Sequence, residues 1–416
     1  MDKLVITGGR PLEGAVRISG AKNAALPVMA ATLLAPGVHT LRNVPRLRDT
    51  QTFARVLELL GAKISFEGNL MTIDTRGVNS VEAPYDLVKT MRASIYVLGP
   101  LLARFGQARV SLPGGCAWGP RPVNLHLTGL QAMGAALDIE HGYIVGHNVK
   151  LKGATVGFDV VSVGATAQLM MAAVLAQGTT VLENVALEPD VTVLGDVLVA
   201  CGARIEGLGT RRLVIEGVSA LRPIDTTIIP DRIEAATFAA AAAMTRGAIR
   251  LESVIPDHFE ATLRKLEEAG CRIRREADAV GISGPARPQA LNVVTQPFPG
   301  FPTDMQAQMI AVCALAAGTS VIEDTIYFDR FTHVPELARM GARIELKGNV
   351  AVVRGVERLS GAQVMATDLR ASASLVLAAL AAEGETRVDR IYHLDRGYET
   401  LEKKLGALGA RIRRVN

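Results

Sequence analysis

The segment Gly20-Ala-Lys-Asn-Ala-Ala-Leu-Pro-Val-Met-Ala-Ala-Thr-Leu-Leu-Ala-Pro-Gly37 places an Ala- and Leu-rich run between a polar start and a glycine. This composition predicts a helix, and the glycine marks its end because glycine adopts, at little cost, the left-handed conformation that stops a helix. A β-like run, a loop and a second helix ending in Gly61-Ala62 follow. The same succession returns along the chain, so it decides the fold.

Six copies of this repeat can be aligned, with a period of roughly 70 residues. The glycines expected to terminate the first helix of each repeat are Gly37, Gly106, Gly178, Gly247, Gly318 and Gly384. The second helices are expected to end at Gly61-Ala62, Gly134-Ala135, Gly202-Ala203, Gly270-Cys271, Gly341-Ala342 and Gly409-Ala410. Strand pairs should follow the second helices, as in Lys63–Phe66 with Leu70–Ile73 and Arg204–Glu206 with Leu213–Ile215.

Six compact α/β repeats predict an α/β protein of two lobes, each built from three repeats. The periodicity breaks near 217–229, which places a lobe boundary there. Residues 1–20 precede the first repeat as an expected strand pair that could complete either lobe.

The composition of the 416 residues is that of a globular protein with a large core, since 49% are hydrophobic and only 4% aromatic. A net charge of +4 is too small to indicate a nucleic-acid surface. The four cysteines show no CxxC spacing, which argues against a zinc site or a disulfide framework and favours a reducing cytoplasm. No apolar run approaches the length of a membrane span, and no signal-peptide core opens the chain.

The predicted start of each first helix collects polar residues. These starts contain Lys22 and Asn23, Arg92, Ser162 to Gly164, Asp231, Asp304, and Asp368 with Arg370. Ser and Asp there are ordinary N-caps, which is a sufficient explanation for any one of them. Cations are harder to explain, because they oppose the helix dipole unless an anion lies nearby. A bound phosphate or carboxylate could supply that anion.

The loop before each second helix is the other comparable position. In the second repeat this loop is Leu112-Pro-Gly-Gly-Cys116-Ala-Trp-Gly-Pro-Arg121-Pro-Val-Asn-Leu125, too rich in glycine and proline for regular structure. Cys116 is either a small apolar filler or a reactive thiol activated near Arg121. Arg396 occupies the equivalent loop of the last repeat. If the two lobes face one another, both loops could line one cleft.

Five cations at these positions could converge on a small polyanion: Lys22, Arg92, Arg121, Arg370 and Arg396. The alternative is that each forms a surface ion pair. Neither a P-loop nor a strand-linked G-x-G-x-x-G motif is present, so the usual ATP and dinucleotide sites are not expected. Asp304 and Asp231 could act as bases, although as N-caps they would need no further role.

Long motifs then identify a resemblance. They are Ser19-Gly-Ala-Lys22-Asn23-Ala-Ala-Leu-Pro, Lys89-Thr-Met-Arg92-Ala-Ser, Leu112-Pro-Gly-Gly-Cys116, Arg121-Pro-Val, Phe301-Pro-Thr-Asp304-Met-Gln-Ala-Gln, Asp368-Leu-Arg370-Ala-Ser-Ala-Ser and Asp395-Arg396-Gly-Tyr. From end to end the chain resembles the UDP-N-acetylglucosamine enolpyruvyl (1-carboxyvinyl) transferases. The resemblance implies two lobes of inside-out α/β barrel type, with residues 22–229 in one and residues 1–21 and 230–416 in the other.

The resemblance also implies transfer of enolpyruvyl from phosphoenolpyruvate to the 3-hydroxyl of UDP-N-acetylglucosamine, the first committed cytoplasmic step of peptidoglycan synthesis. It implies no cofactor, metal, nucleic acid or membrane partner, and we expect a monomer or weak homo-oligomer. By similarity, Lys22, Arg92, Arg121, Arg370 and Arg396 would hold phosphoenolpyruvate. Asp304 would be the general base, and Cys116 the general acid and the residue that fosfomycin attacks in this family.

The remaining positions implied by the resemblance concern the sugar nucleotide. Asn23 and Asp304 would contact the sugar, Arg121, Pro122, Val123 and Leu125 the uridine, Ser162, Val163 and Gly164 the diphosphate, and Ile326 the same pocket. Asp231 and Asp368 are further site positions, and the role of Asp231 stays open. Some relatives carry a lysine where this chain has Val160, so one diphosphate contact is in doubt.

Two rival interpretations remain at this stage. A 5-enolpyruvylshikimate-3-phosphate synthase would use phosphoenolpyruvate similarly, but the Cys116 loop and the Arg121-Pro-Val tract argue against it. A catalytically silent paralogue that binds UDP-sugars is disfavoured by the joint presence of Cys116, Asp304, Lys22 and Arg396.

Overall fold

The computed structural model describes residues 2–89, 91–112, 123–147 and 149–416. The chain divides into two compact lobes. The N-terminal lobe is Gly20–Ile229, and the C-terminal lobe combines Met1–Ser19 with Pro230–Asn416. The chain crosses from one lobe to the other at Ser19 and returns at Pro230.

The N-terminal lobe contains three repeats. Its helices are α1 (Lys22–Ala31), α2 (Arg48–Leu59), α3 (Tyr85–Val88), α4 (Leu98–Phe105), α5 (Asn124–Ala132), α6 (Val163–Ala173) and α7 (Pro189–Ala200), with 3-10 turns η1 (Thr32–Leu34) and η2 (Arg92–Val97). Its strands are β3 (Val38–Arg42), β4 (Lys63–Glu67), β5 (Leu70–Asp74), β6 (Glu82–Ala83), β7 (Ala108–Ser111), β8 (Leu137–Glu140), β9 (Tyr143–Gly146), β10 (Thr155–Gly157), β11 (Thr179–Glu183), β12 (Arg204–Glu206), β13 (Arg212–Glu216) and β14 (Asp225–Thr227).

The C-terminal lobe contains the other three repeats. Its helices are α8 (Arg232–Thr245), α9 (Glu260–Glu268), α10 (Gln306–Ala314), α11 (Val334–Arg339), α12 (Leu369–Ala381) and α13 (Leu401–Ala407), with 3-10 turns η3 (Pro256–Phe259), η4 (Thr303–Met305) and η5 (Ile391–Arg396). Its strands are β1 (Lys3–Thr7), β2 (Glu13–Arg17), β15 (Ala248–Glu252), β16 (Arg272–Arg275), β17 (Ala279–Ser283), β18 (Asn292–Val294), β19 (Thr319–Glu323), β20 (Arg343–Lys347), β21 (Val350–Arg354), β22 (Gln363–Met365), β23 (Glu385–Asp389) and β24 (Arg411–Val415).

Each repeat contributes one four-stranded mixed sheet with the same plan. An edge strand runs parallel to the strand that follows the first helix, and an antiparallel pair completes the sheet, as in β10-β11-β13-β12 and β18-β19-β21-β20. The predicted strand pairs are confirmed, because Ile64 lies opposite Ile73 and Ile205 opposite Ile215.

The opening strands were expected to pair with each other, and that prediction is wrong. β1 lies inside the sheet β22-β23-β1-β24, whereas β2 forms the edge of β16-β17-β15-β2. Each strand fills the place that the repeat leaves open in the C-terminal lobe. In the N-terminal lobe the corresponding edge position beside β3 is filled by β14, so every strand of that lobe's sheets comes from the lobe itself.

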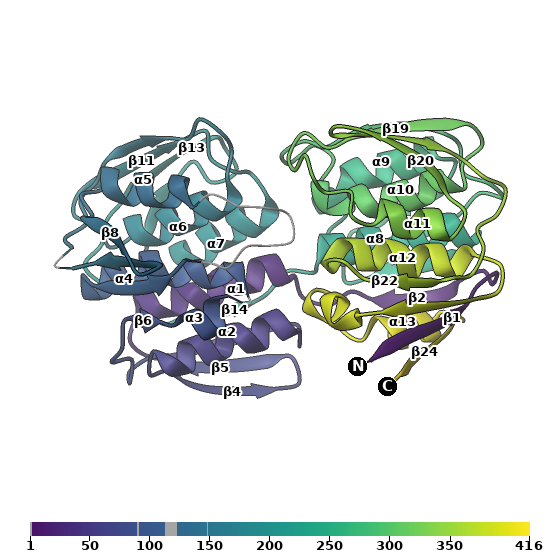
Figure 1. Ribbon diagram of the computed structural model, residues 1–416. Coiled ribbons are helices and arrows are strands. Elements are labelled where there is room, and N and C mark those ends of the chain that lie inside the picture. The colour runs from purple at the N-terminus through teal and green to yellow at the C-terminus, as the bar shows by residue number, and fades with distance from the viewer. Residues whose placement is uncertain (1, 90, 113–122, 148) are drawn as a thin grey trace. The chain divides into compact units, whose positions relative to one another are not determined.

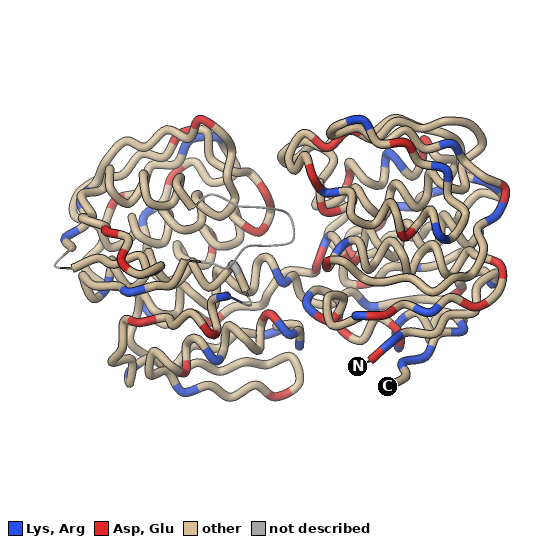
Figure 2. Tube along the Cα trace, in the orientation of Figure 1, with Lys and Arg blue, Asp and Glu red and all other residues tan. Residues whose placement is uncertain are grey.

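The first helices of the repeats lie inside and the sheets outside. In the C-terminal lobe α8, α10 and α12 contact one another, and they lie between β19 and β20 on one side and β1, β2 and β24 on the other (Figure 1). They are buried all round: every residue from Ile233 to Thr245 and from Gln306 to Ala314 is buried. Alanine dominates these helices, which lets their backbones approach closely. Charged residues lie mainly on the outer strands and loops (Figure 2).

The two glycine series differ in role. All six second-helix glycines follow the C-cap and have positive φ, between 88° at Gly134 and 106° at Gly202, which confirms the prediction for that series. The prediction for the first series is right only at Gly106, which is itself a left-handed C-cap. The other five stand beyond the helix end, directly before a strand, where they turn the chain into the sheet.

No helix within the described ranges is long and apolar enough to cross a membrane.

Candidate functional site

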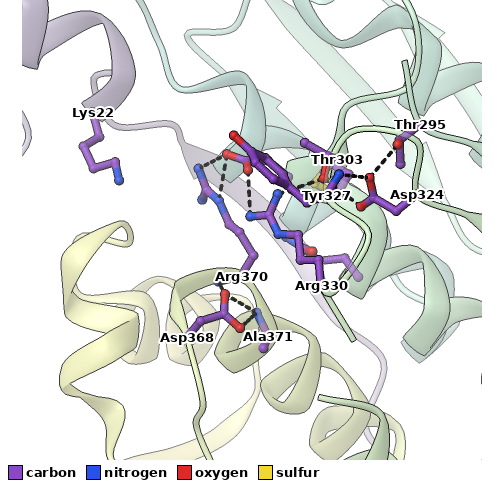
Figure 3. Close-up of polar contacts among 12 residues, drawn as sticks. Lys22, Thr295, Thr303, Asp324, Tyr327, Arg330, Asp368, Arg370 and Ala371 are labelled. Atoms are coloured by element: carbon purple, nitrogen blue, oxygen red, sulfur yellow. Dashed lines mark hydrogen bonds and ion pairs between the residues drawn. The ribbon is translucent and has the colours of Figure 1, made fainter. Parts of the chain in front are cut away.

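The centre of the candidate site in the C-terminal lobe is Asp304, which lies between Arg330 and Arg370. Figure 3 labels the two arginines. Arg370 donates from Nε and Nη2 to Oδ2 of Asp304 at 3.2 and 3.1 Å, and Arg330 Nη2 lies 2.8 Å from Oδ1. Asp304 lies within η4 and does not cap a helix, so the N-cap alternative for it is wrong. The two arginines fix the orientation of the Asp304 carboxylate.

Arg370 is one of the cations that the sequence could not explain at a helix start. It lies in the first turn of α12, its side chain is 2% exposed, and Asp304 supplies the balancing anion. Burial opposes its charge, but Asp304 and the nearby Tyr398 raise the pKa of the guanidinium above its ordinary value. Its Nη1 atom is buried and has no hydrogen-bond partner among the described residues. Arg370 is therefore a fixed, buried cation that lies between the Asp304 carboxylate and the ring of Tyr398.

Asp368 is the N-cap of α12, as the pattern predicted. Its carboxylate accepts hydrogen bonds from the N–H groups of Arg370 and Ala371 at 2.8 and 3.2 Å. Burial raises the pKa of Asp368, and nearby Arg330 partly opposes that rise. Asp231 likewise caps α8, accepting from the N–H groups of Ile233 and Glu234 at 2.8 and 3.1 Å. Both residues thus act structurally on the helices that carry the site.

Arg330 was not singled out from the sequence, although its loop was. It is 6% exposed and donates from Nη1 to the Thr303 hydroxyl at 3.0 Å. Thr303 in turn donates to Oδ2 of the buried Asp324 at 2.7 Å. Ile326, an expected contact of the sugar nucleotide, lies two residues beyond Asp324 in the loop between β19 and α11. The structure therefore places Ile326 and Asp304 in one connected network.

Arg396 ends η5, and the segment around it is fixed on both sides. Asp395 receives two hydrogen bonds from Arg414 of β24, at 3.0 and 2.6 Å. On the other side, a Cβ at Gly397 would lie 2.5 Å from Leu369, so the backbone packs closely against the start of α12. These contacts bring the Arg396 and Arg370 segments together.

In the N-terminal lobe, Lys22 is the first residue of α1, and its Nζ lies 3.3 Å from Oδ2 of Asp49 in the first turn of α2. Both side chains are largely buried, 12% and 6% exposed. Asn23 follows Lys22 in α1. The Asp49 carboxylate offsets the unfavourable interaction of the Lys22 charge with the dipole of α1. Sequence analysis missed this pair, although the repeat places the two residues at the starts of its first and second helices.

The expected sugar-nucleotide residues of this lobe gather at two helix starts. Ser162 caps α6, accepting from the Ala165 N–H at 3.2 Å, and Val163 and Gly164 form the first turn. A Cβ at Gly164 would lie 3.1 Å from Nε2 of His126 in α5. The start of α6 therefore packs against α5, which begins beside Val123 and carries the half-buried Leu125. The backbone N–H groups at the start of α6 form a surface suited to an anion.

Three expected site residues, Cys116, Arg121 and Pro122, lie outside the described residues. Arg92 begins η2, a 3-10 turn that leads into α4. Elsewhere, the described ranges contain no group of three His, Cys, Asp or Glu side chains that could hold a metal ion.

Comparison with known proteins identifies the family. The family model of EPSP synthase (3-phosphoshikimate 1-carboxyvinyltransferase) matches residues 6–405. The chain is 57% identical to a UDP-N-acetylglucosamine 1-carboxyvinyltransferase of Geobacter metallireducens and 55% identical to one of Myxococcus xanthus, with 100% of this chain and 100% and 99% of those proteins covered.

Solved structures confirm the predicted fold class. The enolpyruvyl transferase NikO from Streptomyces tendae superposes with a TM-score of 0.91 at 30% identity, over 100% of this chain and 99% of that one. EPSP synthase from Acinetobacter baumannii gives 0.77 at 16% identity over 100% of both chains, which shows the shared fold alone. The chain therefore belongs to the EPSP synthase family of enolpyruvyl (1-carboxyvinyl) transferases.

Proposed function

We propose that this chain transfers the enolpyruvyl group of phosphoenolpyruvate to the 3-hydroxyl of UDP-N-acetylglucosamine and releases phosphate, the committed step toward peptidoglycan. The observation that carries the proposal is 57% identity, over the whole length of both chains, to a protein named for this activity. Identity to the EPSP synthase of the same fold is only 16%. The charged groups around Asp304 and Lys22 support a site for anionic reactants.

The reaction is an addition followed by an elimination. In the addition, Asp304 accepts the proton of the sugar 3-hydroxyl, the freed oxygen bonds to C2 of phosphoenolpyruvate, and C3 receives a proton from the Cys116 thiol. The product is a tetrahedral ketal that still carries phosphate. In the elimination, the Cys116 thiolate takes a proton back from C3, the C2–C3 double bond forms again and the C2–O bond to phosphate breaks. The proton held by Asp304 leaves with the phosphate, which restores both residues. No cofactor is needed, because no electrons are gained or lost overall.

Phosphoenolpyruvate carries a phosphate and a carboxylate, so it needs several fixed cations. Lys22, Arg92, Arg121, Arg370 and Arg396 supply them in the proposal. Arg370 supports this role most directly, because burial and two hydrogen bonds to Asp304 fix its guanidinium in the site.

UDP-N-acetylglucosamine binds in the proposal through three sets of residues. The N-terminus of α6, at Ser162 to Gly164, receives the diphosphate, since free N–H groups and the helix dipole favour an anion there. Arg121, Pro122, Val123 and Leu125 receive the uridine. Asn23, Asp304 and Ile326 contact the sugar side. We place the reaction in the cytoplasm, with the chain acting as a monomer or weak homo-oligomer.

Phosphate release tests the proposal. Purified protein is incubated with phosphoenolpyruvate and either UDP-N-acetylglucosamine or shikimate 3-phosphate, and Asp304→Asn and Cys116→Ser are assayed alongside. We expect release with the UDP-sugar alone and a loss of about a hundredfold or more in the Asp304 variant. Release with shikimate 3-phosphate would favour EPSP synthase activity, and release with neither substrate from folded protein would leave a UDP-sugar-binding module.

A further inference from the structure

A buried carboxylate outside the assigned residues organises the C-terminal half of the site. Asp324 follows β19, and its residue is 0% exposed. Its Oδ1 accepts three hydrogen bonds, from the Thr295 hydroxyl at 2.8 Å and from the N–H groups of Ile326 and Tyr327 at 3.0 and 2.9 Å. Its Oδ2 accepts one from the Thr303 hydroxyl at 2.7 Å. A carboxylate removed from water is tolerated because donors surround it.

The two oxygens face two different parts of the site (Figure 3). Oδ1 binds the backbone of the loop that contains Ile326, and the Thr295 hydroxyl joins this side by accepting from the Thr325 N–H at 3.0 Å. Oδ2 faces the turn that carries Asp304. One buried side chain thus holds the loop and the turn in fixed register.

The hydrogen bond from Thr303 to Asp324 also determines which way the Thr303 hydroxyl proton points. A threonine hydroxyl has one proton, and a carboxylate can only accept, so Thr303 commits that proton to Asp324. Its oxygen lone pairs then face Arg330 Nη1 at 3.0 Å, and the same guanidinium reaches Asp304 through Nη2 at 2.8 Å. Tyr327 supports Arg330 from another side, with the guanidinium carbon 5.6 Å from its ring centroid.

We propose that Asp324 is a positioning residue for the reaction, which couples the Ile326 loop to the orientation of Arg330 and thereby of Asp304. The inference deepens the proposed function and rests on it, because Ile326 and Asp304 are given their roles there. Asp324 itself touches neither reactant. It acts by keeping a sugar-nucleotide contact and the proton acceptor at one fixed separation, which a reaction with aligned reactants requires.

The hydrogen bonds at Oδ1 and at Oδ2 of Asp324, the two arms of the network, can be removed separately by substitution. Thr303→Val removes the hydroxyl between Asp324 and Arg330 but leaves the three bonds at Oδ1. Thr295→Val is the matched variant for the other oxygen of Asp324. It is an isosteric change at a buried residue, and it removes only the hydroxyl that joins Oδ1 to the Ile326 loop. Asp324→Ala removes both arms, and Asp324→Asn keeps the shape but presents an amide donor to Thr303 or to the backbone N–H groups.

Steady-state phosphate release at varied UDP-N-acetylglucosamine, and its pH profile, give the readout. We expect Thr303→Val to lower kcat about tenfold with a nearly unchanged KM for the UDP-sugar, and Thr295→Val to raise that KM about fivefold with a nearly unchanged kcat. The acid limb of the kcat profile should move to higher pH in Thr303→Val, because the Thr303 hydroxyl no longer holds the Arg330 guanidinium against the Asp304 carboxylate. Asp324→Ala should show both kinetic changes, and Asp324→Asn intermediate ones.

The result that overturns the inference is equally specific. Wild-type kinetics and pH profiles in Thr303→Val and Thr295→Val would reduce Asp324 to a structural role, whether or not Asp324→Ala folds. If the wild-type protein releases phosphate and these two variants behave like it, the inference alone fails. If the wild-type protein releases none, the proposed function fails.

Discussion

Asp304→Asn tests most directly how much the ion pairs of Asp304 with Arg330 and Arg370 stabilise the protein. The substitution leaves the guanidinium groups of Arg330 and Arg370, 7% and 2% exposed, without the carboxylate that separates them. A unit charge pair at about 3 Å attracts by about 5 kcal/mol at an effective dielectric constant near 20. Part of this attraction offsets desolvation, and removing one partner of a buried pair typically costs about 3–5 kcal/mol. We take the lower value, because the Asp304 side chain is 27% exposed and water can enter.

Urea unfolding should therefore show a loss of about 3 kcal/mol in Asp304→Asn. The control is Asp329→Asn, which neutralises an exposed carboxylate of the Arg330 loop and should change stability by less than about 0.5 kcal/mol. A double-mutant cycle with Arg330→Met should return a coupling of about 2 kcal/mol or more. Equal stability of the Asp304 and Asp329 variants, with a coupling near zero, would refute the ion-pair reasoning.

Three further outcomes follow from described residues. Acidification should lower the urea midpoint, because burial lowers the pKa of His39 to about 4 and of His333 to about 3, whereas the unfolded chain takes up protons near its ordinary value of about 6.5. Each buried histidine therefore contributes stability above about pH 6.5 that is lost as the pH falls towards 4, and the loss near pH 5 is about 2 kcal/mol for each histidine. A urea midpoint that does not change between pH 7 and pH 5 would contradict this. Gly409→Ala should destabilise the protein by about 1 kcal/mol, because φ is 94° at that position. Gly406→Ala should stabilise it by about 0.5 kcal/mol, because Gly406 lies inside α13 and an added Cβ meets no atom within 4 Å at either glycine. Thermal melts that rank the two variants in the opposite order would count against the C′ assignment of Gly409. Val160→Ala, at a 67% exposed side chain, should change UDP-sugar affinity by less than about twofold in calorimetry, and a tenfold loss without unfolding would show that residue 160 matters.

Local rules predicted the parts of the fold that depend on a few neighbouring residues. The glycines after the second helices were assigned correctly, because a positive φ at C′ is set by the helix end itself. The N-caps Ser162, Asp231 and Asp368 were recognisable for the same reason. The first glycine series was misassigned because a glycine before a strand looks, in one sequence, like a glycine after a helix.

Distant pairings were beyond such rules. Nothing near β1 in the chain indicates that Leu4 pairs with Val388 on one side and Arg414 on the other. The same holds within the site, where Asp49 balances Lys22 and Asp304 balances Arg370 across long stretches of chain. Residue types showed that cations collect at helix starts, but only the folded chain shows that carboxylates of the protein accompany them.

The place of β1 and β2 in the C-terminal lobe has a consequence for how the protein is made. A ribosome delivers these two strands before their partners, so β2 must wait for β15, and β1 for β23 and β24. Meanwhile Gly20–Ile229 emerges with all the strands of its own three sheets and can fold as a unit. Synthesis therefore builds the inserted lobe before its host, and β1 keeps exposed edges until β23 and β24 have been made.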